Sequence, residues 1–290
     1  MNYNIYYFSG TGNSLAIAKK LAKLTGSKYK SIPSVMPQIQ TEIFGEHIII
    51  VFPSYLAMIY GIPMVVKEFI ENIPNLASLK ITAICSCGGY EIVNAVPSVR
   101  VLEKIIQKQG GVLFDYYTLR LPMNNLDYDH IPFPIEKDNG ILIEAADKKI
   151  EFIAKNLHKR KLFSLKRILI HIFHILMKPL YMILKKISLK SMVVIAKEPV
   201  DTQKSIEEIF RLTDRSISAD DKCNGCGICV KVCPVNNIQL VDKQPVWLNK
   251  CEMCFACHEW CPQKAIHHWG RKDGVYYHHP EVSLLDILPS

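Results

Sequence analysis

The sequence lacks a long apolar run even in its most apolar region. Only ten residues, Ile168–Met177, lie between charged residues there, and two of the ten are His. A helix that spans a membrane needs about 20 apolar residues, so such a helix is not expected. The first eight residues contain no Lys or Arg and their apolar run ends at Ser9, which argues against a secretory signal. These absences favour a cytoplasmic protein.

Acidic residues are missing from one long internal stretch. Between Phe152 and Lys197 there are eleven Lys or Arg and no Asp or Glu, while the whole chain has a formal net charge of +8. Outside this stretch 24 basic residues face 27 acidic ones, so the excess positive charge belongs to one segment. Residues 159–190 are otherwise largely apolar, and Pro179 is expected to kink or split a helix there.

Three roles remain open for this basic segment. It packs its apolar face between two modules, it makes peripheral membrane contact through residues 159–190 with an anionic surface, or it docks an acidic redox partner. No nucleic-acid partner is expected. The sequence leaves the oligomeric state open.

The first 160 residues alternate between strand and helix patterns. Continuous apolar runs such as His47–Pro53 are typical of strands buried on both faces. The expected strands are Tyr3–Phe8, His47–Pro53, Lys80–Cys87 and Val112–Leu119, and the expected helices are Ser14–Leu24, 63–73, Glu91–Gln109 and Ile141–His158. Strands separated by helices predict an α/β fold with a doubly wound parallel sheet.

Two tightly spaced cysteine runs lie near the C-terminus. Eight of the ten cysteines form the pattern Cys-x2-Cys-x2-Cys-x3-Cys-Pro twice, offset by 28 residues at every position. The first run is Cys223, Cys226, Cys229 and Cys233, and the second is Cys251, Cys254, Cys257 and Cys261. Such a repeat indicates metal binding in a reducing compartment rather than disulfide bonds.

The spacing within each run is that of proteins that bind two [4Fe–4S] clusters, in which the fourth cysteine binds the other cluster. One cluster is therefore expected on Cys223, Cys226, Cys229 and Cys261, and the other on Cys251, Cys254, Cys257 and Cys233. Zinc also binds Cys-x2-Cys pairs, but four cysteines and a trailing Pro, present twice, fit zinc poorly. Clusters with thiolate ligands alone leave no iron open to a substrate, which favours electron relay.

A glycine-rich turn lies between the first expected strand and the first expected helix. It consists of Ser9, Gly10, Thr11, Gly12, Asn13 and Ser14. Backbone N–H groups and hydroxyls at a helix start bind phosphate groups, and the absence of Lys argues against a nucleoside triphosphate. We expect a ligand with a single phosphate; the alternative is a turn that only caps the helix.

The run FSGTGNS resembles the phosphate loop of flavodoxins, although Asn13-Ser14 stands where a Thr is commoner. Flavodoxins place two further loops beside the flavin ring, and the matching residues here are Pro53, Ser54 and Tyr55 and then Cys87, Gly88 and Gly89. With the cysteine runs and the Pro-Met-Asn-Asn stretch at 122–125, the chain resembles the flavodoxin–ferredoxin fusion proteins of anaerobes.

This resemblance implies a flavodoxin-like sheet of five strands in the order 2-1-3-4-5, followed by a small α+β ferredoxin-like domain. It also implies FMN and two [4Fe–4S] clusters, and electron transfer with redox partner proteins. The expected division is a flavodoxin-like domain at 1–158, the basic helical segment at 159–200, a linker at 201–216, the cluster domain at 217–268 and a tail at 269–290.

A rival hypothesis is an FMN-dependent reductase that its own clusters supply with electrons. The loop 121–139 is long enough to cover a substrate, and His130 or Tyr128 is a candidate proton donor. A third hypothesis is a flavodoxin-like domain that has lost FMN and serves only for docking.

Several further side chains have a functional and a plain structural interpretation. Tyr55 and Tyr90 are candidates to flank a flavin ring, whereas Cys85 and Cys87 are expected to be packed rather than joined in a disulfide. The tail histidines at 267–268 and 278–279 are expected to be solvated, and the three Trp to belong to the core of the cluster domain.

Overall fold

The computed structural model describes residues 3–43, 45–55, 61–124, 138–159, 165–269 and 276–288. The chain divides into two units. The first contains the chain up to Phe8 together with Ser14–Pro122 and Asp138–Ile187. The second contains Ser9–Asn13, the chain around Met123 and Asn124, and the chain from Ser188 onward.

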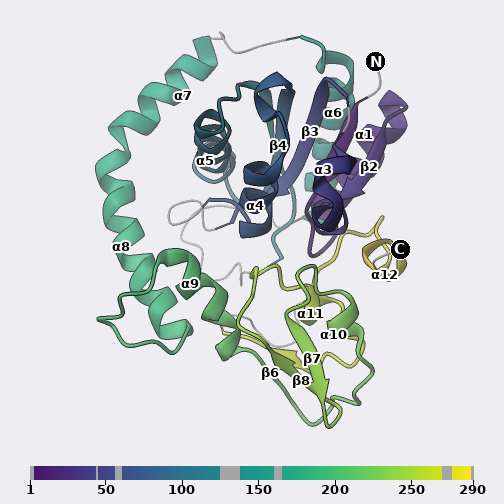
Figure 1. Ribbon diagram of the computed structural model, residues 1–290, viewed down its shortest axis with the longest axis vertical. Helices are drawn as coiled ribbons and strands as arrows, with labels where there is room; N and C mark the ends of the chain where they lie inside the picture. Colours follow the sequence, from purple (N-terminus) through teal and green to yellow (C-terminus); the bar gives the residue numbers. More distant parts are fainter. Residues whose placement is uncertain are drawn as a thin grey trace. The chain divides into compact units, whose positions relative to one another are not determined.

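The first unit is built on a parallel sheet of five strands in the order β2-β1-β3-β4-β5 (Figure 1). Its strands are β1 (Asn4–Tyr7), β2 (Lys28–Ser31), β3 (His47–Pro53), β4 (Lys80–Cys87) and β5 (Leu113–Arg120). Its longer helices are α1 (Asn13–Thr25), α4 (Met64–Asn72), α5 (Ala95–Lys108) and α6 (Asn139–Asn156), and its short ones are α2 (Ile32–Val35), η1 (Met36–Gln38), α3 (Ile39–Glu42) and η2 (Leu76–Ser78). This strand order, the one expected from the sequence, is that of the flavodoxin-like fold.

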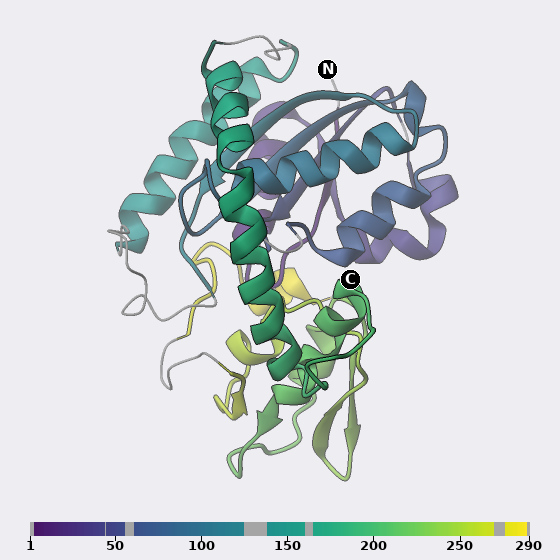
Figure 2. The same ribbon diagram turned by 90° about the vertical axis from the view of Figure 1, so that its left-hand side faces the viewer.

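Helices cover both faces of the sheet. One buried cluster joins Ile5 and Ile49 of the sheet to Leu21 of α1 and Ile150 of α6, so α1 and α6 share a face. Tyr6 points to the opposite face because side chains alternate along a strand, and its ring lies 5.2 Å from that of Phe69 in α4. Figure 1 shows α4 and α5 on one side of β3 and β4 and α1 and α6 on the other, and Figure 2 shows α5 face-on.

Apolar runs located four strands correctly and left one unlocated. β3 and β4 have the expected bounds, and β1 and β5 differ from expectation by one residue at each end. β2 has the sequence KYKS and lies at the sheet edge with three of its four residues exposed. An exposed edge strand needs no apolar side chains, so its sequence carries no strand signal. α5 begins at Ala95 rather than Glu91, because residues 91–94 form a turn.

The basic segment forms two successive helices, α7 (Leu165–Leu176) and α8 (Lys178–Ile195). The chain bends by 60° between them, next to Pro179, where a break was expected (Figure 1). Among the described residues, no single helix is long and apolar enough to cross a membrane; only α7 and α8 taken together reach that length.

The second unit is built from short elements that repeat. They are α9 (Ile206–Arg211), η4 (Leu212–Ser216), β6 (Ser218–Ala219), α10 (Ile228–Lys231), β7 (Ile238–Val241), β8 (Gln244–Trp247), α11 (Ala256–Glu259), β9 (Ile266–His267) and α12 (Leu284–Ile287). Helices α10 and α11 are related by the 28-residue offset of the cysteine runs. β6 pairs antiparallel with β9, and β7 pairs antiparallel with β8. Asp242 and Lys243 connect β7 to β8 with positive φ at both, as a tight hairpin turn requires.

Two expectations about this unit were wrong. Residues 201–216, expected as a linker, contain α9 with a Ser205–Glu208 capping box, and Phe210 is buried. The tail histidines are not all solvated, because His268 and His279 are buried. The burial of His279 comes from contact with the distant residue Thr11, which no local pattern reveals. The start of α9, in contrast, has a local pattern, because Ser205-x-x-Glu208 is a helix-start signature.

Candidate functional site: two cysteine-lined cavities and a glycine-rich loop

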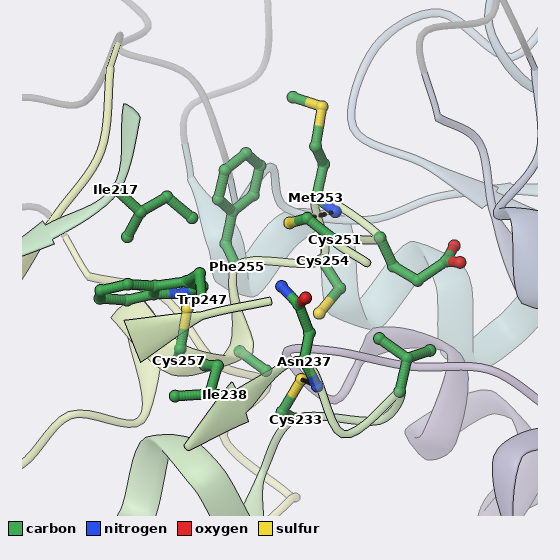
Figure 3. A pocket seen from close by; sticks show the side chains of 13 residues that line it. Ile217, Cys233, Asn237, Ile238, Trp247, Cys251, Met253, Cys254, Phe255 and Cys257 are labelled. Atoms are coloured by element: carbon green, nitrogen blue, oxygen red, sulfur yellow. Dashed lines mark hydrogen bonds between the residues drawn. The ribbon is translucent and has the colours of Figure 1, made fainter. Parts of the chain in front are cut away.

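Four cysteines line each of two cavities in the second unit. Cys251, Cys254 and Cys257 of the second run share one cavity with Cys233 of the first run (Figure 3). The other cavity is lined by Cys223, Cys226, Cys229 and Cys261. The structure thus groups three cysteines of one run with the last cysteine of the other, which is the grouping expected for the ligands of two clusters.

Local backbone structure places these cysteines. Cys229 lies in α10 and Cys257 in α11, and the last cysteine of each run follows one of these helices. The N–H of Asn237 donates to Cys233 Sγ at 3.2 Å and the N–H of Ala265 donates to Cys261 Sγ at 3.4 Å, again 28 residues apart. The N–H of Met253 donates to Cys251 Sγ at 3.2 Å. Donors of this kind stabilise negative charge on sulfur ligands.

The two cavities differ in their contact with solvent. We call the one with Cys254 the inner cavity and the one with Cys226 the outer cavity. Cys254 is buried, and Met253, Phe255 and Trp247 also line the inner cavity (Figure 3). Cys226 is exposed at the outer cavity. Solvent exposure and apolar cover are among the properties that set the potential of a cluster, so the two sites are not equivalent.

Burial holds the thiols of the inner cavity in the neutral form when no cation is present. It raises the pKa of Cys251 and Cys254 well above the usual value, with neighbouring thiols as a further cause. Burial also raises the pKa of Cys229 in the outer cavity to about 11. A bound metal reverses this effect, because a coordinating thiol loses its proton to the cation. The donor set of four thiols with N–H groups aimed at sulfur fits an iron–sulfur cluster.

The glycine-rich turn is a close-packed loop in the second unit. Gly10, Thr11 and Gly12 are buried, and Ser9 Oγ accepts a hydrogen bond from the N–H of Gly12 at 3.1 Å. Gly12 has a φ of +98°, which favours glycine. Helix α1 begins at Asn13, so the loop leads into a helix N-terminus, where backbone N–H groups bind anions. These features fit a bound phosphate group.

The residues expected beside the flavin ring lie where two strands of the first unit, β3 and β4, end. Ser14 Oγ and Ser86 Oγ are 3.2 Å apart and buried, and the N–H of Ser54 donates to the carbonyl of Ser86 at 2.7 Å. Ser14, Ser54 and Ser86 are thus brought together. Pro53 ends β3, and Tyr55 pairs with Gly61 through two backbone hydrogen bonds.

The third expected loop follows β4. Cys87 ends that strand, and its thiol donates to the carbonyl of Gly89 at 3.4 Å; Gly88 lies between them. Burial raises the pKa of Cys87 to about 12, and Cys85 and Cys87 are both free. Tyr90 is 42% exposed and lies under the Arg120 guanidinium, 5.4 Å from it.

Sequence reasoning missed the residues that hold the glycine-rich loop. Asn124 donates to Thr11 Oγ1 at 2.9 Å, and Trp260, Tyr277 and His279 contact other loop residues. Asn124 belongs to the Pro-Met-Asn-Asn stretch, the one signal that could have pointed to it. The candidate proton donors Tyr128 and His130 lie outside the described residues.

Comparison with known proteins assigns the cysteine region. Residues 216–262 match the family model described as a 4Fe-4S dicluster domain. No curated protein matches the chain.

Similar solved structures include the Trp repressor binding protein from Bacillus subtilis, 15% identical with a TM-score of 0.40, covering 56% of this chain and 99% of that one. A Fusobacterium nucleatum flavodoxin bound to flavin mononucleotide is 15% identical with a TM-score of 0.38, covering 55% of this chain and 97% of its own. Oxidised flavodoxin 1 from Bacillus cereus is 15% identical with a TM-score of 0.38, and the match covers 57% of this chain and 100% of that one.

The first unit has the strand order of the flavodoxin-like fold, and residues 216–262 match a 4Fe-4S dicluster domain. The sequence resemblance is therefore confirmed at the level of its two parts.

Proposed function

We propose that this chain is an electron-transfer protein that binds FMN and two [4Fe–4S] clusters and exchanges electrons with a redox partner protein. The observation that carries the proposal is the pair of cavities, each lined by three cysteines of one run and one of the other. Two separate sets of four thiols support two clusters rather than one.

The chain's own residues favour electron transfer over catalysis at the metal. Every expected ligand is a thiol, so each cluster would be fully coordinated by protein. The N–H groups of Met253, Asn237 and Ala265 would stabilise charge on the ligands. When bound, the clusters supply one-electron steps and FMN supplies one- or two-electron steps.

The proposed flavin site consists of three loops. Ser9–Ser14 would bind the phosphate through backbone N–H groups and hydroxyls, and the loops at Pro53–Tyr55 and Cys87–Gly89 would flank the ring. The neutral Cys87 thiol, with its pKa near 12, adds no charge beside the ring. The last two loops follow the carboxyl ends of β3 and β4, and sheets of this strand order bind their ligands at those ends.

Quantification of iron, acid-labile sulfide and flavin after anaerobic purification tests the proposal. We expect about eight irons, about eight sulfides and about one FMN per chain, as two [4Fe–4S] clusters require. Zinc in place of iron would contradict the cluster assignment, and about four irons would reduce it to one cluster. Purified protein without flavin that also fails to bind added FMN would leave only the iron–sulfur half.

A double substitution, Thr11→Ala with Ser14→Ala, separates the two cofactor sites. Both side chains are buried at the loop and the start of α1, and neither lines a cysteine cavity. We expect the variant to lose FMN and to keep its iron. Loss of iron as well would show that the substitutions unfold the cluster domain.

A further inference from the structure

The loop Ser9–Asn13 accepts hydrogen bonds from donors in the last 35 residues of the chain. The indole N–H of Trp260 donates to the carbonyl of Gly10 at 2.9 Å, and the N–H of His279 donates to the carbonyl of Thr11 at 2.9 Å. The hydroxyl of Tyr277 donates to Asn13 Oδ1 at 2.7 Å. All these residues belong to the same unit.

The segment that is hydrogen-bonded to the loop also carries cysteines of the cluster sites. Trp260 lies between α11 and Cys261, and Cys257 lies within α11. Glu259, buried in the same helix, accepts a hydrogen bond from the N–H of Tyr277 at 2.6 Å. The Trp260 ring also stacks on His278 with centroids 4.4 Å apart. The position of Tyr277 is therefore set by α11.

Engaging the carbonyls of the loop fixes the direction of its N–H groups. In a planar trans peptide the C=O and N–H point in opposite directions, so Trp260, which holds the Gly10 carbonyl, directs the N–H of Thr11 to the other side. Tyr277 holds the side chain of Asn13 instead, at the residue where α1 begins. Phosphate recognition at a loop of this kind depends on those N–H groups. Thr11 Oγ1 accepts from Asn124, which leaves its single hydroxyl hydrogen to donate.

We propose that Trp260 and Tyr277 are positioning residues for phosphate recognition by the loop Ser9–Asn13, so that FMN affinity depends on the cluster domain. The inference rests on the proposed binding of FMN. It predicts a selective effect. Removing the hydrogen bonds from Trp260 and Tyr277 should weaken FMN binding, but it should not weaken the binding of riboflavin, which has the same ring without the phosphate.

The test measures dissociation constants of FMN and riboflavin by flavin fluorescence for the full-length, cluster-loaded protein. The variants are Trp260→Phe and Tyr277→Phe, which remove one donor each and keep an aromatic ring. The matched control is Tyr276→Phe, since the hydroxyl of Tyr276 donates to the carbonyl of Lys264, which does not belong to the loop. A net hydrogen-bond contribution of about 1 kcal/mol predicts roughly fivefold weaker FMN binding for each variant and unchanged riboflavin binding.

Each outcome supports or contradicts the role proposed for Trp260 and Tyr277. Equal FMN affinity in all four proteins would overturn the inference, and so would parallel loss of FMN and riboflavin affinity, which indicates general damage. Iron content, measured on every sample, detects a variant that fails to fold; should Trp260→Phe do so, Tyr277→Phe alone still decides. A wild-type protein that binds no FMN sinks the proposed flavin function itself, whereas wild-type binding with unchanged variants sinks only this inference.

A second, independent observation concerns α7 and α8. Large apolar side chains are exposed along both helices: Ile168, Leu169, Ile172, Phe173, Ile175, Leu176, Leu180, Met182, Ile183 and Ile187. Lys178, Lys185, Lys186 and Lys190 are exposed on α8, and no acidic residue occurs between Phe152 and Lys197. Monomeric proteins rarely leave so much contiguous apolar surface uncovered.

We infer that α7 and α8 bind an anionic membrane surface. Exposed apolar side chains flanked by cations alone complement a lipid boundary with negatively charged headgroups. An acidic protein partner would also attract the cations, but ten exposed apolar side chains on successive helices favour a lipid boundary, which is apolar beneath its headgroups.

Co-sedimentation of the full-length protein with lipid vesicles tests this surface. We expect binding to phosphatidylglycerol-containing vesicles that weakens with salt, and little binding to pure phosphatidylcholine. Lys185→Gln with Lys186→Gln should lower the partition coefficient about fivefold per lysine, from roughly 1 kcal/mol for each charge. Leu176→Gln should lower it too, because Leu176 is 72% exposed.

The matched control, Lys104→Gln with Lys108→Gln, removes the same charge from exposed positions on α5. An equal loss in this control would show a general charge effect and overturn the inference. Absence of vesicle binding by the wild-type protein would overturn it as well, and would leave packing between modules or an acidic protein partner as the role of these helices.

Discussion

Phe255 stands in the second cysteine run where Gly227 stands in the first, and both have a left-handed backbone, with φ of 58° and 74°. Met253 and Gly225 form a second such pair, with φ of 48° and 71°. Glycine adopts this conformation without steric cost, whereas a side chain costs roughly 1–2 kcal/mol. The second run accepts that cost where Met253 and Phe255 line the inner cavity. The second run thus combines a strained backbone with apolar cover of the inner cavity.

The outer cavity allows the backbone cost to be measured by itself. A Cβ at Gly227 would meet only Leu240, at 3.6 Å, so Gly227→Ala should lower stability by about 1–2 kcal/mol, the conformational cost alone. A Cβ at Gly225 would lie 2.7 Å from Lys243 Cβ and 2.9 Å from its carbonyl oxygen, so Gly225→Ala should cost more. Anaerobic denaturant unfolding followed by cluster absorbance gives both values; equal losses would disprove the steric argument.

Cysteine double variants test which thiols share a cluster. Cys233→Ala with Cys254→Ala removes two thiols from the inner cavity, so about four of about eight irons should remain. Cys233→Ala with Cys226→Ala removes one thiol from each cavity, and most of the iron should be lost. Iron and sulfide analysis distinguishes the two. The reverse result, in which the pair from one run keeps half the iron, would mean that each run binds its own cluster.

The parts of this protein that the sequence predicted are those with local patterns. Buried strands such as β3 and β4 have continuous apolar runs, and the cysteine spacing repeats at a constant offset. Strand β2 could not be located because KYKS is exposed at an edge. The start of α5 was misplaced because residues 91–94 continue its pattern but form a turn.

The hydrogen bonds that hold the glycine-rich loop could not be predicted from the sequence, and the reason is a different one. Tyr277 and Asn13 are 264 positions apart, and a hydroxyl–amide hydrogen bond between them requires no pattern in either segment. The tail has short polar and aromatic residues without helical or strand periodicity, so His279 was expected to be solvated. Its burial comes from tertiary contact with Thr11 and Gly12.

Acid should weaken the first unit through His47. Burial, with the charge of Lys80 as a second cause, lowers the pKa of His47 to about 4, against about 6.5 when unfolded. Between these values the folded state binds fewer protons, so this stabilising contribution is present above pH ~6.5 and is lost as pH falls toward ~4. The ring donates to or accepts from Thr82 Oγ1 at 2.8 Å and contacts Tyr3 edge-on.

Replacing the titrating ring should remove this pH dependence. His47→Gln keeps a partner for Thr82 but carries no charge, so its stability should fall less than that of the wild type between pH 7 and pH 4. The difference should reach about 1–2 kcal/mol, after allowance for solvent screening of a partly exposed ring. Urea unfolding of both proteins at each pH measures it. Parallel stability curves would show that His47 does not titrate in this range.

Gly10 should be the most sensitive position of the glycine-rich loop. A Cβ there would lie 2.4 Å from the carbonyl oxygen of Cys254 and 2.7 Å from its Cβ, and neither atom belongs to a flexible side-chain end. Gly10→Ala must therefore displace the loop from the Cys254 segment and break the hydrogen bond from Trp260 to the Gly10 carbonyl. We expect FMN binding to weaken by more than about tenfold, since both packing and a hydrogen bond are lost.

Gly26→Ala is the matched glycine control for this effect. Gly26 has a φ of +66°, and among the described residues no atom beyond its chain neighbours lies within 4 Å of the position that a methyl group would take there. The substitution should therefore cost about 1 kcal/mol of stability and leave FMN affinity unchanged. Titration with FMN and iron analysis of both variants separate the steric effect from the conformational one. If Gly10→Ala keeps wild-type FMN affinity, the loop does not need its close approach to Cys254, and the flavin and cluster sites are structurally independent.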